Sequence, residues 1–137
     1  MIVLDTNVLS EPMHAAPSLG VLNWLDIQPD QMALTAISVG ELLTGISQLP
    51  GGKRRDKLAQ AAEEVLGRWA LVLPYDTEAA RAFARIRELA RAEGRGISIE
   101  DGMIAAICIV HGATLATRNT SDFDFLPVPT VNPWLAP

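Results

Sequence analysis

Apolar and polar positions along the chain predict short strands that alternate with longer amphipathic helices. Short apolar runs predict five strands, at residues 1–4, 32–35, 71–73, 113–117 and 128–131. Apolar side chains at helical spacing predict the intervening helices, over residues 18–27, 38–49, 53–70, 77–93 and 98–111. This alternation is typical of a parallel sheet covered by helices on both faces. Ligand sites in such sheets form beyond the carboxyl ends of the strands.

Length and composition predict one domain over residues 1–137, in a protein that is soluble and cytoplasmic. Hydrophobic residues make up 49% of the chain, which is too many for a disordered protein. No apolar stretch approaches the ~18 residues that a membrane span needs, and the N-terminus lacks the pattern of a signal peptide. The single cysteine, Cys108, excludes an intramolecular disulfide and a cysteine-rich zinc site.

The charges are distributed unevenly along the chain. The formal net charge is -5, which opposes a simple basic nucleic-acid-binding domain, so we expect no DNA binding by this chain alone. Ten of the eleven basic residues lie between Lys53 and Arg95. The arginines of the long helix form either a solvated, salt-bridged face or a rim that contacts phosphates; they are Arg81, Arg85, Arg91 and Arg95.

Four acidic residues stand where the hydrophobic pattern predicts burial or a strand end. They are Asp5 after the first strand, Glu41 and Asp101 in apolar helices, and Asp122 after the fourth strand. Burying a charge costs several kcal/mol unless the charge has a partner. The adequate explanations are a distant arginine, a raised pKa or a bound cation. Carboxylate oxygens are hard donors, which suit Mg²⁺ or Mn²⁺ better than zinc or copper.

Purely structural interpretations of these acids are also open. Glu41 follows Ser38, and Asp101 follows Ser98, at the spacing of a helix capping box. Asp5 and Asp122 could each accept hydrogen bonds from nearby backbone in a turn. These interpretations do not exclude a site, because a carboxylate at a helix N-terminus stays ionised in the field of the helix dipole.

Four segments resemble the acidic motifs of PIN-domain proteins, specifically the VapC-type toxins of bacterial type II toxin–antitoxin pairs. They are IVLDTNVLSE at 2–11, ISVGELLTG at 37–45, IEDGMIAA at 99–106 and LATRNTSDF at 115–123. The ending VNPW at 131–134 is similar to the FitB-like subgroup. The resemblance implies a PIN-like three-layer α/β/α fold, with a central parallel sheet of about five strands and usually a homodimer.

The resemblance also implies an activity: a Mg²⁺- or Mn²⁺-dependent endoribonuclease that is neutralised by a cognate VapB-like antitoxin. Asp5, Glu41, Asp101 and Asp122 occupy the four acidic positions and are the expected catalytic residues. Asp5, Asp101 and Asp122 are the expected metal ligands. Asn7 and Thr117 are expected beside them, whereas Asp124 has no firm place in the pattern.

Two other functions remain open from the sequence. In the first, the protein is a catalytically weak PIN-fold binding module that acts mainly through a complex with a DNA-binding antitoxin. Its acidic pocket would then chiefly hold a basic segment of that partner. The second is a metal-dependent phosphatase of the haloacid-dehalogenase type. The segment Asp5-Thr6-Asn7 opposes it, because the second aspartate of the Asp-x-Asp motif is missing.

Overall fold

Five parallel strands form the central sheet, in the order β3-β2-β1-β4-β5. The computed structural model of the chain describes residues 1–69 and 71–136. The strands are β1 (Ile2–Leu4), β2 (Met32–Thr35), β3 (Val72–Leu73), β4 (Thr114–Ala116) and β5 (Thr130–Val131). Because β1 lies in the middle, it pairs with β2 on one side and with β4 on the other. The predicted parallel sheet is confirmed.

Six helices connect and cover these strands. They are α1 (Thr6–Ser10), α2 (Leu19–Ile27), α3 (Ala36–Ser47), α4 (Lys53–Arg68), α5 (Thr77–Ala92) and α6 (Ile99–His111). Two short 3₁₀ turns, η1 (Glu11–Met13) and η2 (Thr120–Phe123), complete the order of elements. The hydrophobic pattern predicted α2 to α6, but not α1, η1 or η2. The end predicted for the helix of residues 53–70, at Ala70, lies outside the described residues.

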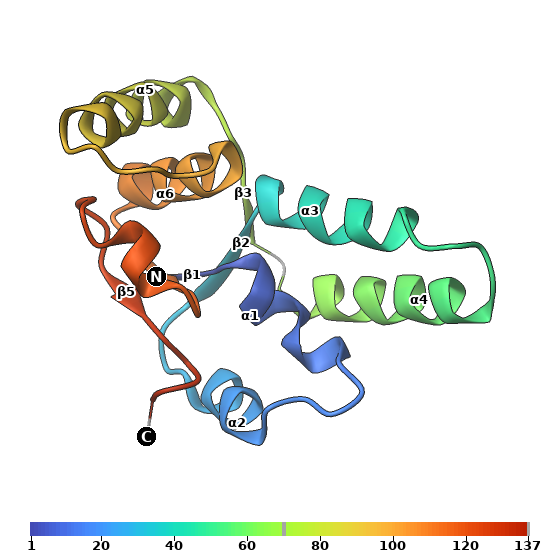
Figure 1. The fold of residues 1–137 in the computed structure, drawn as a ribbon. Helices are drawn as coiled ribbons and strands as arrows, with labels where there is room; N and C mark the ends of the chain where they lie inside the picture. Colours follow the sequence, from blue (N-terminus) through green and yellow to red (C-terminus); the bar gives the residue numbers. More distant parts are fainter. Residues whose placement is uncertain (70, 137) are drawn as a thin grey trace.

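The helices form one layer on each face of the sheet (Figure 1). Alternate strand residues point to opposite faces, so each strand contributes to two cores. Val3, Ala33 and Leu115 belong to the core that α5 and α6 cover. Leu4 and Leu34, in contrast, pack with the side chains of α1, α2, α3 and α4. The predicted three-layer α/β/α arrangement is therefore confirmed.

Helix α3 begins earlier than the sequence predicted. The Thr35 hydroxyl caps it by accepting a hydrogen bond from the Ser38 amide at 3.0 Å. The helix therefore begins at Ala36, directly at the end of β2, and Glu41 lies beyond its first turn. In a capping box, the Glu41 carboxylate would accept a hydrogen bond from the Ser38 amide. That amide donates to the Thr35 hydroxyl instead, so the capping-box interpretation of Glu41 is wrong.

Helices α5 and α6 pack very closely. A Cβ atom added to Gly102 in α6 would lie only 2.9 Å from the Phe83 ring in α5. This approach requires glycine at position 102, one residue after Asp101. None of the helices in the described residues has both the length and the apolar character needed to cross a membrane.

Candidate active site

Three of the four predicted acidic residues line one cavity, at the edge of the sheet where β1 and β2 end. Its volume is about 320 Å³, and its lining residues are Asp5, Thr6, Asn7, Ser10, Glu41, Asp101 and Asn119. The three carboxylates come from the end of β1, from α3 and from α6. None of the lining residues is basic. A distant arginine therefore does not account for these acids, which was the first of the three explanations offered by the sequence.

Asp5 is buried, with 6% of its surface exposed, and both of its carboxylate oxygens have partners. Oδ1 accepts a hydrogen bond from the Thr6 amide at 2.8 Å, and Oδ2 accepts one from the Thr117 hydroxyl at 2.7 Å. Burial raises the pKa of Asp5, whereas the bonds from Thr117 and Thr6 act in the opposite direction. The charge of Asp122 raises the pKa further. The predicted position of Thr117 beside the site is confirmed.

Glu41 is oriented by the residue that follows Asp5. The Thr6 hydroxyl donates a hydrogen bond to Glu41 Oε1 at 2.7 Å. Thr6 therefore contacts two carboxylates, one through its amide and one through its side chain. This single residue fixes the end of β1 relative to α3.

Asp101 lies in the first turn of α6, where the Ser98 hydroxyl accepts a hydrogen bond from its amide at 3.1 Å. Ser98 thus caps the helix, as the capping-box spacing predicted. The pKa of the Asp101 carboxyl is raised to about 6, first by burial and then by the charge of Asp5. Glu41 and Asp122 also raise this pKa, while the Ser98 hydrogen bond lowers it. The other three predicted acids are therefore near enough to Asp101 for their charges to affect its protonation.

Asp122 and Asp124 occupy different surroundings. Asp122 is exposed in η2 and does not line the cavity, although its charge raises the pKa values of Asp5 and Asp101. Asp124 forms an ion pair with Arg95 at 2.7 Å. Arg95 also donates to the Ser121 carbonyl at 2.9 Å. Asp124 therefore helps to hold η2 against the segment that follows α5.

Two neutral amides complete the cavity. Asn7 was expected here from the resemblance, and its Oδ1 atom is buried without a hydrogen-bond partner among the described residues. Asn119 also lines the cavity, but sequence reasoning did not single it out. An uncharged side chain in a loop gives no hydrophobic or charge signal. Only its place three residues before Asp122, within the fourth motif, could have indicated it.

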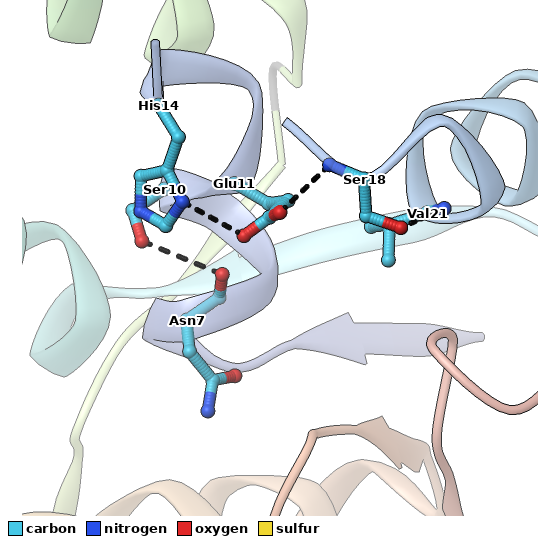
Figure 2. Close-up of polar contacts among 6 residues, drawn as sticks. All are labelled: Asn7, Ser10, Glu11, His14, Ser18 and Val21. Atoms are coloured by element: carbon cyan, nitrogen blue, oxygen red, sulfur yellow. Dashed lines mark hydrogen bonds and ion pairs between the residues drawn. The ribbon is translucent and has the colours of Figure 1, made fainter. Parts of the chain in front are cut away.

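A buried acid outside the cavity was also missed (Figure 2). Glu11 in η1 is 6% exposed, pairs with His14 Nδ1 at 3.0 Å and accepts a hydrogen bond from the Ser18 amide at 2.9 Å. Figure 2 shows the Asn7 side chain directed away from Glu11, His14 and Ser18. Glu11 therefore links η1 to the start of α2 and does not line the site.

The fit of a divalent cation can be tested on the donors of the cavity. Within residues 1–69 and 71–136, no three or more His, Cys, Asp or Glu side chains are arranged so that they could hold one ion. Mg²⁺, however, usually takes one or two protein carboxylates and keeps several waters. Asp5 and Asp101 meet that requirement, and the unpaired Oδ1 of Asn7 adds an oxygen donor. The donor set fits such an ion, and the ligand set Asp5, Asp101 and Asp122 stays a prediction.

Comparison with known proteins identifies the family. The PIN domain model matches residues 2–126, so the chain belongs to the PIN-domain family. It is 44% identical over 137 residues to VapC ribonuclease Y4jK of Sinorhizobium fredii, a match that covers 98% of each protein. It is 40% identical over 140 residues to toxin FitB of Neisseria gonorrhoeae, covering 98% of this chain and 99% of FitB.

A solved structure agrees with these relatives. The crystal structure of FitAcB from Neisseria gonorrhoeae matches this fold with a TM-score of 0.91 and 40% identity. The match covers 99% of this chain and 100% of that chain. The resemblance to VapC-type toxins and to the FitB-like subgroup is confirmed.

Proposed function

We propose that the protein is the toxin of a type II toxin–antitoxin pair and acts as a Mg²⁺- or Mn²⁺-dependent endoribonuclease in the cytoplasm. The main support is the convergence of Asp5, Glu41 and Asp101 on one cavity that no basic residue lines. The chain also covers nearly the whole length of a relative named as a VapC ribonuclease and of one named as a toxin. In this proposal the protein hydrolyses RNA phosphodiester bonds, and a cognate VapB-like antitoxin neutralises it.

Of the predicted ligands Asp5, Asp101 and Asp122, the first two would hold the cation directly, and the exposed Asp122 would act on it through its charge. Glu41 is the fourth catalytic residue of the proposal. When bound, a divalent cation polarises a phosphate and makes a nearby water more acidic. Its charge also offsets the repulsion that the acidic cavity exerts on RNA. In the hydrolysis, the water oxygen would form a bond to phosphorus and give up a proton, while the bond between phosphorus and the leaving nucleotide oxygen breaks and that oxygen takes up a proton from solvent.

The remaining side chains orient these groups. Thr117 and Thr6 hold the two oxygens of Asp5, so that carboxylate keeps one orientation. The Thr6 hydroxyl directs Glu41, which can orient the attacking water by accepting its hydrogen bond. Asn7 Oδ1 has no protein partner among the described residues and can accept a second hydrogen bond from a water in the cavity.

The partners follow from the same site and from the resemblance. A basic segment of the antitoxin would fit the acidic cavity and block it. The net charge of -5 opposes DNA binding by this chain, so DNA recognition would belong to the antitoxin. The proposal includes a homodimer, which the resemblance to VapC-type toxins implies.

The test is RNA cleavage by purified, antitoxin-free protein. Transfer RNA and other RNAs are incubated with Mg²⁺, with Mn²⁺ or with EDTA, and we expect cleavage only with a metal. Asp5→Asn and Asp101→Asn should abolish cleavage and preserve the fold and the dimer, because the amide keeps the volume and loses the charge. Asp26→Asn is the control, since Asp26 is exposed and pairs with Arg68 away from the cavity.

Two outcomes would contradict this proposal. Cleavage by Asp5→Asn at a rate near that of the unaltered protein would show that the reaction does not take place in this cavity. An unaltered protein that binds its antitoxin tightly, but cleaves no RNA with either metal, would instead support the binding module.

A further inference from the structure

A second cavity, of opposite charge, lies at the C-terminal end of α5. Its volume is about 290 Å³, and its lining residues are Arg87, Ala90, Arg91, Arg95, Gly96 and Ile97. Three arginines thus line one small space in a chain whose net charge is -5. Of the four arginines that the sequence offered as a phosphate-contacting rim, only Arg91 and Arg95 line this cavity.

Most of this positive charge is not neutralised by the protein. Arg95 is the exception, because it pairs with Asp124 at 2.7 Å. Arg87 donates to the Ile97 carbonyl at 3.0 Å, which is a neutral acceptor that leaves the charge in place. The sequence left open that Arg91 belongs to a salt-bridged face, but the described residues contain no ion pair of Arg91. The arginine cavity therefore offers two guanidinium groups to an anion.

A short stretch of chain connects the arginine cavity to the carboxylate cavity. Ile97 lines the first, Ser98 caps α6 and Asp101 lines the second. Four residues of chain span at most about 14 Å, so the Cα atoms of Ile97 and Asp101 are no further apart than that. Arg95 also donates to Ser121, which precedes Asp122 (Figure 1 shows η2 beside β5). The loop between α5 and α6 thus lines the arginine cavity and leads into the helix that carries Asp101.

We propose that Arg87 and Arg91 bind a backbone phosphate of the RNA whose scissile phosphate lies in the carboxylate cavity. This inference rests on the proposed function and adds where the substrate strand runs. A guanidinium group binds a phosphate through two parallel hydrogen bonds. One strand of duplex DNA carries a phosphate about every 3.4 Å along the helix axis, so a strand of about four such nucleotides covers the stretch from Ile97 to Asp101 at its longest. Arg95 acts as a positioning residue that fixes the loop to η2.

The test measures RNA binding as a function of salt. The Asp5→Asn protein, in which cleavage is stopped, is titrated with a labelled single-stranded RNA in Mg²⁺, and fluorescence anisotropy gives Kd at each salt concentration. Each phosphate contact to a single strand contributes about -0.7 to the slope of log K against log salt. We expect Arg91→Gln to reduce the slope by about 0.7, and Arg87→Gln with Arg91→Gln by about 1.4. Arg91→Lys should retain the slope because it keeps the charge.

Matched controls separate this cavity from general surface charge. Arg81→Gln removes an arginine of the same helix that does not line the cavity, and its slope should stay unchanged. A dinucleotide is the short probe, since it cannot reach both cavities. Arg91→Gln should weaken binding of the long RNA by more than it weakens binding of the dinucleotide. Circular dichroism and melting confirm that each variant is folded.

Several results would overturn the inference. The first is a salt slope for RNA binding that is the same in Arg91→Gln as in the protein with Arg91 intact. The second is an equal loss of slope in Arg91→Gln and Arg81→Gln. The third is that Arg91→Gln weakens binding of the antitoxin but not of RNA. Failure of the proposed function has a different signature, because the unaltered protein would then cleave no RNA whatever its affinity. Cleavage combined with Arg91-independent binding would refute the arginine cavity alone.

Discussion

At the scale of single residues, two threonines hold the acidic side chains of the site. Thr6 contacts Asp5 and Glu41, and Thr117 contacts Asp5 from the end of the neighbouring strand β4. Hydroxyls and amides orient a carboxylate without neutralising it, whereas an arginine would do both. The negative charges of the cavity therefore remain to act on one another, and the raised pKa of Asp101 is one result.

The raised pKa of Asp101 predicts that this acid destabilises the metal-free protein at neutral pH. Its pKa is about 6 when folded and about 3.8 in an unfolded chain, so the folded state binds more protons between these values. The free energy of unfolding then falls as pH rises from about 4 to 6. At pH 7, in EDTA, Asp101→Asn should raise the free energy of unfolding by roughly 1–2 kcal/mol, after allowing for solvent screening. Thermal melts from pH 4 to 8 measure this gain, which should vanish near pH 4.

The neighbouring acid provides the control. Glu100 also lies in the first turn of α6, but it is exposed and outside the cavity. Glu100→Gln should lower stability by about 0.3–1 kcal/mol through lost interaction with the helix dipole. Mn²⁺ should stabilise the unaltered protein through binding and stabilise Asp101→Asn far less. The contrary outcome is that Asp101→Asn melts at a lower temperature than the unaltered protein, as Glu100→Gln should, and that Mn²⁺ has no effect. Asp101 would then only stabilise the N-terminal end of α6.

At the scale of elements, the contact between α5 and α6 sets the position of Asp101. Asp101 precedes Gly102, whose missing side chain lets the Phe83 ring approach. The ring belongs to α5 and packs against the core of that face. The end of α6 that carries Asp101 is therefore located by a close helix–helix contact, in addition to the cap at Ser98.

This contact predicts opposite effects for two glycine-to-alanine substitutions. Alanine is about 1 kcal/mol better than glycine inside a helix. In Gly102→Ala, the clash with Phe83 should cost about 1–3 kcal/mol and outweigh that gain. In Gly45→Ala, nothing lies within 4 Å of the new Cβ, so the protein should become more stable. Urea denaturation of both variants checks the signs, and a Gly102→Ala protein as stable as Gly45→Ala would refute the close packing.

The sequence was most informative about elements whose own pattern defines them. The strands and the helices α2 to α6 were predictable because burial repeats at a regular period. Helix α1 was not, since five residues are too few to show a period. The start of α3 was misplaced because Thr35 and Ser38 are both good caps, and only the end of β2 decides between them.

The site was predictable to the same degree and for a similar reason. Asp5 and Asp101 were found because a charged residue interrupts or opens an apolar run. Glu41 was found by the same pattern, and the capping alternative that the sequence left open for it was wrong. The ion pair of Arg95 with Asp124 joins parts of the chain far apart in sequence, and nothing local to either residue signals it.

At the scale of the whole molecule, acidic and basic groups line separate cavities. The carboxylate cavity has no basic lining residue, and the arginine cavity has no acidic one. A partner that carries a basic side chain is thus attracted to the first, and a phosphate to the second. Such segregated fields mainly accelerate encounter, while contacts made inside a cavity slow dissociation.

This arrangement predicts how the proposed antitoxin binds. If an arginine or lysine of the antitoxin enters the carboxylate cavity, Asp101→Asn should increase the dissociation rate, because a desolvated ion pair is lost. Added salt should mainly reduce the association rate. Surface plasmon resonance at low and high salt measures both rates, with Asp26→Asn as the exposed control. Identical dissociation rates for Asp101→Asn and the unaltered protein would argue against a basic side chain of the antitoxin in the carboxylate cavity.

The hydrogen bond from Thr117 to Asp5 joins residues 112 positions apart, and this separation has a consequence for synthesis of the protein on the ribosome. The central strand β1 emerges first, but its neighbour β4 follows only when Thr114–Ala116 have been made. At about 5–20 residues per second, the nascent chain waits roughly 6–20 seconds for that partner. Until then Asp5 lacks Thr117, and for most of that time it lacks Asp101. A chain released early would carry the first acidic motif without a working centre, so the producing cell meets the proposed nuclease only after the segment from Asp101 to Thr117 has been made.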